Sequence, residues 1–140
     1  MRNFHLPGRS PTYSSKGMVA TSHPIASQAA LRALEKKGNA IDAALAAALV
    51  LPICEPQMTG LYGDMFALIN HPDHDEIIGI NGSGKSPAAL SADLLRSNNN
   101  NKIPANSPHS ITLPGAVIAF ETLANDFSEL GLEEACCAAA

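Results

Sequence analysis

The most informative segment for the architecture is Gly38-Asn-Ala-Ile-Asp-Ala-Ala-Leu-Ala-Ala-Ala-Leu-Val50. Asn39 is a favourable N-cap residue, and Asp42 three positions later completes a variant of the capping box, so a helix is predicted to begin here. Apart from Asp42, residues 41–50 are apolar all round, which is typical of a helix with neighbours on several sides. We expect it to be the central element of the core.

Another helix is predicted before this segment. Ser22-His23-Pro24 provides a start with proline in the first turn, and apolar residues between 25 and 34 repeat with amphipathic spacing. Lysines in the last turn favour the helix dipole, and Gly38 is expected to take the left-handed conformation that ends the helix. The run over residues 17–21 has a short β-like pattern.

Two strands are predicted after the central helix, over residues 65–69 and 76–80, with a turn over residues 71–75 between them. Residues 55–64 contain proline and glycine and form a loop. Further helices are predicted over residues 88–96 and 116–127. On the second of these, one face is expected to carry Val117, Phe120, Leu123 and Ala124. Residues 133–140 begin a helical pattern that no cap closes, so we expect the chain to be truncated.

Composition limits the class of protein. The chain has 140 residues, of which 46% are hydrophobic and 16% charged, and this balance favours one folded domain over disorder. We expect an extended arm over residues 1–16 and a partial domain over residues 17–140. The formal net charge is −4 and no basic stripe is visible, so no nucleic-acid partner is expected.

The cysteines and the first residues of the chain indicate where in the cell the protein is located. Three cysteines without metal-ligand spacing fit a reducing compartment, and the first residues lack the apolar region of a signal peptide. The longest apolar run is too short to cross a bilayer. We therefore expect a cytoplasmic protein without a membrane partner.

One short motif points to nucleotide binding. Residues Gly79-Ile-Asn-Gly-Ser-Gly-Lys-Ser86 match the phosphate-loop pattern, in which backbone N–H groups hold phosphates, Lys85 contacts the outer phosphates and Ser86 binds Mg²⁺. A phosphate loop follows the first strand of a parallel sheet, and no second strand ending in an aspartate is visible after Ser86. The alternative is a glycine-rich turn after a strand.

A set of longer blocks is more specific in combination. The blocks are Gly17-Met-Val-Ala-Thr-Ser-His-Pro-Ile-Ala-Ser27, Leu34-Glu-Lys-Lys-Gly-Asn-Ala-Ile-Asp-Ala-Ala44, Glu55-Pro-Gln-Met-Thr-Gly-Leu-Tyr-Gly-Asp-Met-Phe66, Asn81-Gly-Ser-Gly-Lys-Ser-Pro87 and Thr112-Leu-Pro-Gly-Ala116. Their order and spacing resemble the N-terminal part of gamma-glutamyltransferase (gamma-glutamyltranspeptidase) family proteins. Residues 6–11 and the Asn-Gly-Ser-Gly block are similar to a cytoplasmic bacterial branch of amidohydrolases, which includes oxamate-amidohydrolase-like proteins.

The resemblance implies an α/β fold that is the N-terminal portion of the αββα sandwich of N-terminal-nucleophile hydrolases. It also implies a proenzyme that cuts itself into two subunits and frees a threonine at the start of the small subunit. That threonine attacks an amide carbonyl, with its own α-amine as base. The implied partners are an amide substrate, the rest of the large subunit and the small subunit; no metal or organic cofactor is implied.

Under this resemblance, the site residues of this chain bind substrate and none is catalytic. Five threonines are present and none matches the position of the nucleophile: Thr12, Thr21, Thr59, Thr112 and Thr122. The chain by itself is therefore expected to be inactive. The implied substrate-binding residues are Lys85, Ser83 and Asn81.

The binding positions depart from those of relatives. The glutathione-cleaving branch carries an arginine at the position of Ser83, and the amidohydrolase-like branch carries one at the position of Lys85. A lysine is a point charge and cannot form the bidentate fork of an arginine. Tyr62 stands where the family has a glycine.

Three functions stay open at this point: part of a gamma-glutamyltransferase-like amidohydrolase or acyltransferase, a small nucleotide-binding module through residues 79–86, or a non-catalytic remnant. Lys85 is either a carboxylate ligand or an exposed loop lysine, and Asn81, Gly82 and Gly84 either shape a pocket wall or form a turn. Asp42 and His23 are expected at helix starts. His71 and His74 are expected in a solvated turn.

Overall fold

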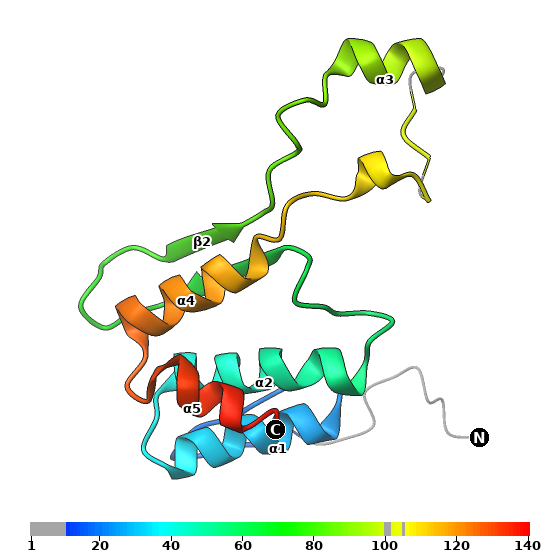
Figure 1. Ribbon diagram of the computed structural model, residues 1–140. Coiled ribbons are helices and arrows are strands. Elements are labelled where there is room, and N and C mark those ends of the chain that lie inside the picture. Colours follow the sequence, from blue (N-terminus) through cyan, green and yellow to red (C-terminus); the bar gives the residue numbers. More distant parts are fainter. Residues whose placement is uncertain (1–10, 100–101, 105) are drawn as a thin grey trace.

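The computed structural model describes residues 11–99, 102–104 and 106–140. The elements in chain order are α1 (Pro24–Glu35), α2 (Ala40–Cys54), β1 (Met65–Ile69), β2 (Ile78–Gly82), α3 (Ala92–Asn99), a 3₁₀ turn (Pro108–Ser110), α4 (Ala116–Phe127) and α5 (Gly131–Cys137). Figure 1 shows α4 between α2 and the hairpin formed by β1 and β2. Helix α3 lies far from them, in the segment over residues 86–112, which we call the excursion. Within the described ranges no helix has the length and apolar character needed to cross a membrane.

Helices α1 and α2 pack through alanine side chains. The buried residues on their facing surfaces are Ala26, Ala29, Ala30, Ala33, Ala43, Ala46, Ala47 and Val50. Small side chains at a contact allow helix axes to approach closely. On another side of α2, Leu45 is buried with residues of α4 and α5. The prediction of a central helix with neighbours on several sides is confirmed.

The start of α2 has the predicted capping box. Oδ1 of Asn39 accepts hydrogen bonds from the backbone N–H groups of Ile41 (2.8 Å) and Asp42 (3.1 Å). In return, Oδ2 of Asp42 accepts one from the backbone N–H of Asn39 (2.7 Å). Local sequence signals therefore fix where this helix begins.

The turn between α1 and α2 differs from the prediction. Lys37 takes the left-handed conformation, with φ of 68°, and Gly38 does not. A Cβ atom on Gly38 would lie 2.7 Å from Cδ1 of Leu130 and 2.8 Å from Cβ of Asp42. Glycine is required at position 38 because other parts of the chain lie against it, not because of its backbone angles.

Strands β1 and β2 form an antiparallel pair in which Met65 is opposite Gly82 and Ile69 is opposite Ile78. Ile69 is buried against α4, whereas Phe66 and Leu68 on the other face are exposed. The bounds predicted for β1 are confirmed. The second strand was predicted over residues 76–80 and lies two residues later, since pairing with β1 continues through Gly82. Residues 17–21, predicted to be β-like, form no strand.

The later helices are close to their predicted positions. The range of α4 is confirmed, but its buried face is made by Ala116, Ala119, Phe120, Leu123 and Ala124. Val117 was predicted on that face and is 47% exposed instead. Helix α3 begins four residues after its predicted start, following Ser91, whose hydroxyl accepts a hydrogen bond from the N–H of Leu94 (3.2 Å). Of the predicted arm, residues 1–10 lie outside the described residues, and residues 11–16 are exposed and in no helix or strand.

Candidate functional site

Three chain segments come into direct contact where β2 ends and α4 begins: residues 63–65, residues 82–85 and residues 113–119. We call this contact the crossing, and glycine residues make it possible. A Cβ atom on Gly82 would lie 2.5 Å from Cβ of Ala119 and 2.7 Å from the carbonyl oxygen of Met65. A Cβ atom on Gly84 would overlap the backbone of Leu113. Neither glycine has a positive φ, so both are required by the close approach of α4 and the segment before it rather than by a turn conformation.

Backbone hydrogen bonds hold this crossing together. The carbonyl oxygen of Gly63 accepts from the N–H groups of Gly115 (3.2 Å) and Ala116 (3.0 Å). The carbonyl oxygen of Lys85 accepts from the N–H of Leu113 (2.9 Å). The loop before β1, the segment after β2 and the first turn of α4 are thereby fixed relative to one another.

A side chain adds a further tie. Oδ1 of Asp64, the residue before β1, accepts a 2.8 Å hydrogen bond from the backbone N–H of Gly84. Carboxylate acceptors make stronger hydrogen bonds than neutral ones. Asp64 therefore anchors the residue that precedes Lys85.

A groove of about 620 Å³ runs along the crossing. The three residues predicted to bind substrate, Asn81, Ser83 and Lys85, line it together and are all exposed. The rest of the lining comes from β2, from the segment before α4 and from one side of α4. These residues are Gly79, Ile80, Gly82, Gly84, Leu113, Pro114, Gly115, Ile118, Ala119 and Thr122. The groove thus combines an apolar wall with a polar one.

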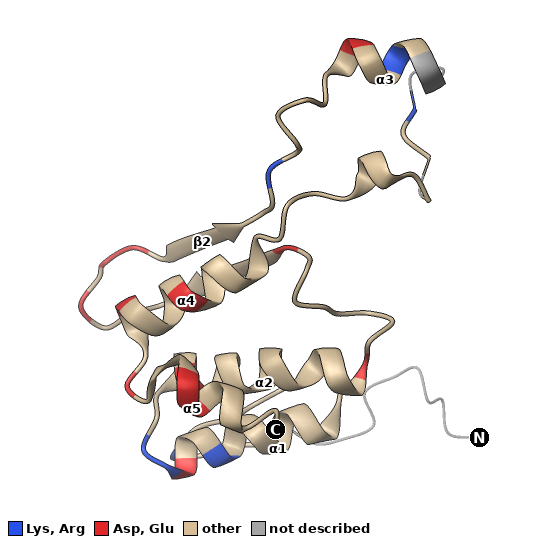
Figure 2. Cartoon of the chain, in the orientation of Figure 1, with Lys and Arg blue, Asp and Glu red and all other residues tan. Residues whose placement is uncertain are grey.

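The polar wall offers hydrogen bonds and one positive charge. Oδ1 of Asn81 accepts from the N–H of Ser83 (3.0 Å), which leaves the two donors of the Asn81 amide for other partners. Within the described part of the chain, no ion pair involves Lys85. Figure 2 shows a blue segment, the colour of Lys and Arg, on the chain just beyond β2. An ammonium group in this position can pair with an anionic group of a ligand.

The structure does not support the phosphate-loop hypothesis for residues 79–86. Residues 79–82 belong to an antiparallel strand, and no helix begins after Ser86 until Ala92. A phosphate loop instead passes directly from a strand into the N-terminus of a helix, whose N–H groups bind the phosphate. The glycines of this segment serve the crossing with α4.

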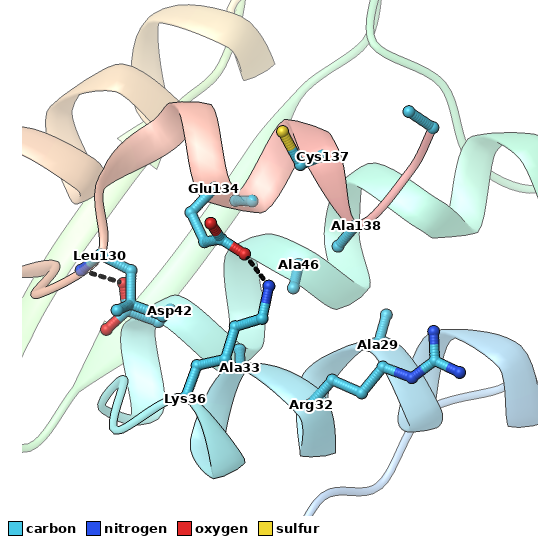
Figure 3. A pocket seen from close by; sticks show the side chains of 12 residues that line it. Ala29, Arg32, Ala33, Lys36, Asp42, Ala46, Leu130, Glu134, Cys137 and Ala138 are labelled. Carbon is cyan, nitrogen blue, oxygen red and sulfur yellow. Dashed lines mark hydrogen bonds and ion pairs between the residues drawn. The ribbon is translucent and has the colours of Figure 1, made fainter.

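A second cavity of about 250 Å³ lies between α1, α2 and α5, as Figure 3 shows. Alanines form much of its wall, and Lys36 and Glu134 pair with each other at its edge. Asp42 accepts a hydrogen bond from the N–H of Leu130 (3.0 Å). Of the four charged residues in its lining, Lys36, Glu134 and Asp42 have partners within the chain, and Arg32 forms no ion pair among the described residues. We assign the candidate site to the groove beside α4 because that groove brings together the three residues predicted to bind substrate.

Asp42 is a structural residue, as predicted. Its side chain is 2% exposed. Burial raises its pKa, but hydrogen bonds from the hydroxyl of Ser128 and from the N–H groups of Asn39, Leu130 and Glu129 outweigh burial, so the pKa lies below its ordinary value of 3.8. The carboxylate is therefore ionised and fully engaged at neutral pH.

Three described histidines lie at a helix start or in a turn. His23 is the N-cap of α1, where its Nδ1 accepts from the N–H of Ile25 (3.2 Å), as predicted. His71 and His74 lie in the turn between the strands, with ring centroids 5.3 Å apart. Among the described residues, no group of three or more His, Cys, Asp or Glu side chains could hold a metal ion.

Sequence reasoning missed Asp64 and the wall formed by α4. Each had a local signal: Asp64 follows a loop glycine, and Pro114-Gly115 interrupts the chain just before a helix. Neither signal says that these residues lie beside Lys85. Only the crossing of distant segments brings them together.

The profile of the protein family described as Gamma-glutamyltranspeptidase matches residues 26–139. The chain belongs to the gamma-glutamyltranspeptidase family. The chain is 37% identical over 121 residues to the glutathione hydrolase-like YwrD proenzyme of Bacillus subtilis, covering 86% of this chain and 23% of the relative. It is 43% identical over 84 residues to the oxamate amidohydrolase proenzyme of Klebsiella pneumoniae, covering 59% of this chain and 16% of the relative. The chain thus spans less than a quarter of either relative.

A solved structure agrees with the family assignment. The gamma-glutamyltranspeptidase of Helicobacter pylori superimposes with a TM-score of 0.83 at 25% identity, over 93% of this chain and 38% of that chain. The predicted fold class, part of an αββα N-terminal-nucleophile hydrolase, is confirmed by this likeness. The gamma-glutamyltranspeptidase resemblance drawn from the separate sequence blocks is confirmed as well.

Proposed function

We propose that this gamma-glutamyltranspeptidase-family chain is part of the large subunit of an N-terminal-nucleophile amidohydrolase, and that the groove beside α4 binds the acyl part of an amide substrate. The observation that carries the proposal is the groove itself, where Asn81, Ser83 and Lys85 line one polar wall. The names of the relatives, a glutathione hydrolase-like proenzyme and an oxamate amidohydrolase proenzyme, support an amide substrate.

Each polar residue has a role in this proposal. The ammonium of Lys85 pairs with a carboxylate of the acyl group, while the amide of Asn81 and the hydroxyl of Ser83 hydrogen-bond to its other polar atoms. Because an ammonium imposes no bidentate geometry, short carboxylates fit this wall as well as a gamma-glutamyl group does. The substrate class is therefore an amide with a nearby carboxylate.

The reacting groups come from the companion subunit in this proposal. The hydroxyl of its N-terminal threonine attacks the amide carbonyl, and the α-amine of the same residue takes the proton and passes it to the leaving amine. Water or an amine acceptor then releases the acyl group from the threonine oxygen. This chain contributes the wall that holds the acyl group during both steps.

The first test recovers the native gene product from its source cells with an antibody against this chain and measures intact masses. A companion chain beginning with threonine supports the proposal. A chain recovered alone contradicts it and leaves the non-catalytic remnant. Fractionation of the same cells tests the cytoplasmic location, which is also part of the proposal.

The second test measures hydrolysis of glutathione, a gamma-glutamyl anilide and oxamate by the recovered enzyme. We expect Lys85→Ala to raise KM for these carboxylate-bearing amides about tenfold, because it removes a charged hydrogen-bond donor. Lys102→Ala is the matched control, since Lys102 is an exposed lysine that does not line the groove. Equal KM values for the two variants would contradict the role of Lys85.

A further inference from the structure

Lys85 is held in place on both sides of its backbone. Its carbonyl oxygen accepts from the N–H of Leu113 (2.9 Å), and the N–H of the preceding residue, Gly84, donates to Oδ1 of Asp64 (2.8 Å). The first bond joins two backbone groups, so it does not depend on the side chains at either position. The second depends on the side chain at position 64. The residue type at position 64 therefore decides whether this second bond can form.

Asp64 reaches this point from a separate part of the chain. It precedes Gly84 by 20 residues and immediately follows Gly63, whose carbonyl oxygen accepts from the first N–H groups of α4. The anchor is thus tied to α4 as well as to β1. Asp64 is not among the residues that line the groove, so it reaches a ligand through Gly84 and Lys85 and not by direct contact.

Gly84 has no side chain that could hydrogen-bond to its neighbours. A Cβ atom at this position would overlap the backbone of Leu113, so a larger residue cannot take over the task. The N–H of Gly84 is the group through which the segment is anchored. Without its partner, the long side chain of Lys85 starts from a less ordered backbone, and more conformational entropy is lost when a ligand binds.

We propose that Asp64 is a positioning residue for Lys85: its carboxylate fixes Gly84 and so places the ammonium of Lys85 before a ligand carboxylate arrives. This inference rests on the proposed function of the groove. It assigns to Asp64 a role in carboxylate recognition, and the residue acts without touching substrate.

The test compares Asp64→Ala, which removes the acceptor, with Asp64→Asn, which keeps an oxygen in its place. Both are made in the enzyme recovered with its companion chain and assayed with oxamate. We expect Asp64→Ala to raise KM about tenfold with kcat little changed, and Asp64→Asn to stay within about threefold of the wild-type KM. Asp126→Ala, an exposed aspartate at the far end of α4, is the control.

Two further readouts separate positioning from general damage. In the Lys85→Ala background, Asp64→Ala is expected to add no further rise in KM, because the two residues act as a unit. Hydrogen exchange of the Gly84 amide is expected to accelerate in Asp64→Ala. Additive KM effects, unchanged Gly84 exchange, or an Asp64→Asn variant as impaired as Asp64→Ala would each overturn the positioning role.

The two proposals fail in different ways. If Lys85→Ala raises KM and Asp64→Ala does not, the positioning role of Asp64 is wrong and the groove keeps its proposed function. If Lys85→Ala leaves KM unchanged, the proposed carboxylate contact is wrong and the positioning role falls with it.

Discussion

The hydroxyl of Ser128 donates a 2.5 Å hydrogen bond to Oδ1 of Asp42, which joins the first turn of α2 to the segment between α4 and α5. The N–H groups of Glu129 (3.2 Å) and Leu130 (3.0 Å) donate to the same carboxylate. These partners lie 86 to 88 residues beyond Asp42. A residue whose sequence signal is a local helix cap therefore also ties together distant parts of the core.

The Asp42 carboxylate is expected to be a large contributor to stability. Asp42→Ala leaves the donors of Asn39, Ser128, Glu129 and Leu130 without their acceptor, and we expect it to lower the free energy of unfolding by about 3 kcal/mol. Urea unfolding measures this change. Asp126→Ala, an exposed aspartate, is expected to change the same quantity by less than about 0.5 kcal/mol. A small effect at both positions would contradict the role of Asp42 as a tie.

The contribution of Asp42 is expected to depend on pH. Its pKa is lower in the folded chain than its ordinary value of 3.8, so the folded state favours the ionised form. This stabilisation is fully present above the unfolded pKa and is lost as pH falls through the folded pKa. The stability difference between wild type and Asp42→Asn is therefore expected to shrink from about pH 5 to about pH 2. Urea unfolding across this range checks it, and a constant difference would disprove it.

Close contact at Gly82 predicts a strong response to one methyl group. Gly82→Ala places a Cβ atom 2.5 Å from that of Ala119, so β2 and α4 must move apart. We expect a loss of about 2 kcal/mol in the free energy of unfolding. Gly60→Ala is the matched control, because nothing lies within 4 Å of the Cβ it would add. Equal thermal stability of the two variants would show that the crossing tolerates a side chain.

The turn between α1 and α2 predicts opposite effects at neighbouring positions. Lys37→Gly relieves a left-handed lysine and is expected to raise the free energy of unfolding by about 0.5 kcal/mol. Gly38→Ala is expected to lower it by about 2 kcal/mol, since the new Cβ atom would lie 2.8 Å from that of Asp42. Denaturant unfolding of both variants tests the pair. Destabilisation by Lys37→Gly would show that the left-handed residue is not under strain.

Local signals made the helices predictable. The capping box at Asn39 and the helix start at His23 depend on residues a few positions away, and both are present as expected. The predicted face of α4 included Val117, whereas the structure buries Ala116 and Ala119. Those alanines are buried because the hairpin lies directly against α4, and their own neighbours in sequence do not reveal that contact.

Long-range contacts explain the other differences. Asn81 and Gly82 are typical turn residues, so β2 was predicted to end before them, yet pairing with Met65 and Phe66 continues the strand. The candidate site shows the same difference between local and long-range signals. Asn81, Ser83 and Lys85 were predicted from one sequence block, whereas the α4 wall and the hydrogen bond from Gly84 to Asp64 depend on segments that are distant in the sequence.

The hydrogen bond between the Lys85 carbonyl and the Leu113 N–H also closes the excursion that carries α3 (Figure 1). When the ends of a segment are already joined, doubling its length costs only about 0.6 kcal/mol in closure entropy. Residues can therefore be inserted into the excursion, removed from it or replaced, in evolution or by engineering, while Lys85 and the start of α4 keep their spacing. We expect the sequence of the excursion to vary more among relatives than the sequence of the groove at its base.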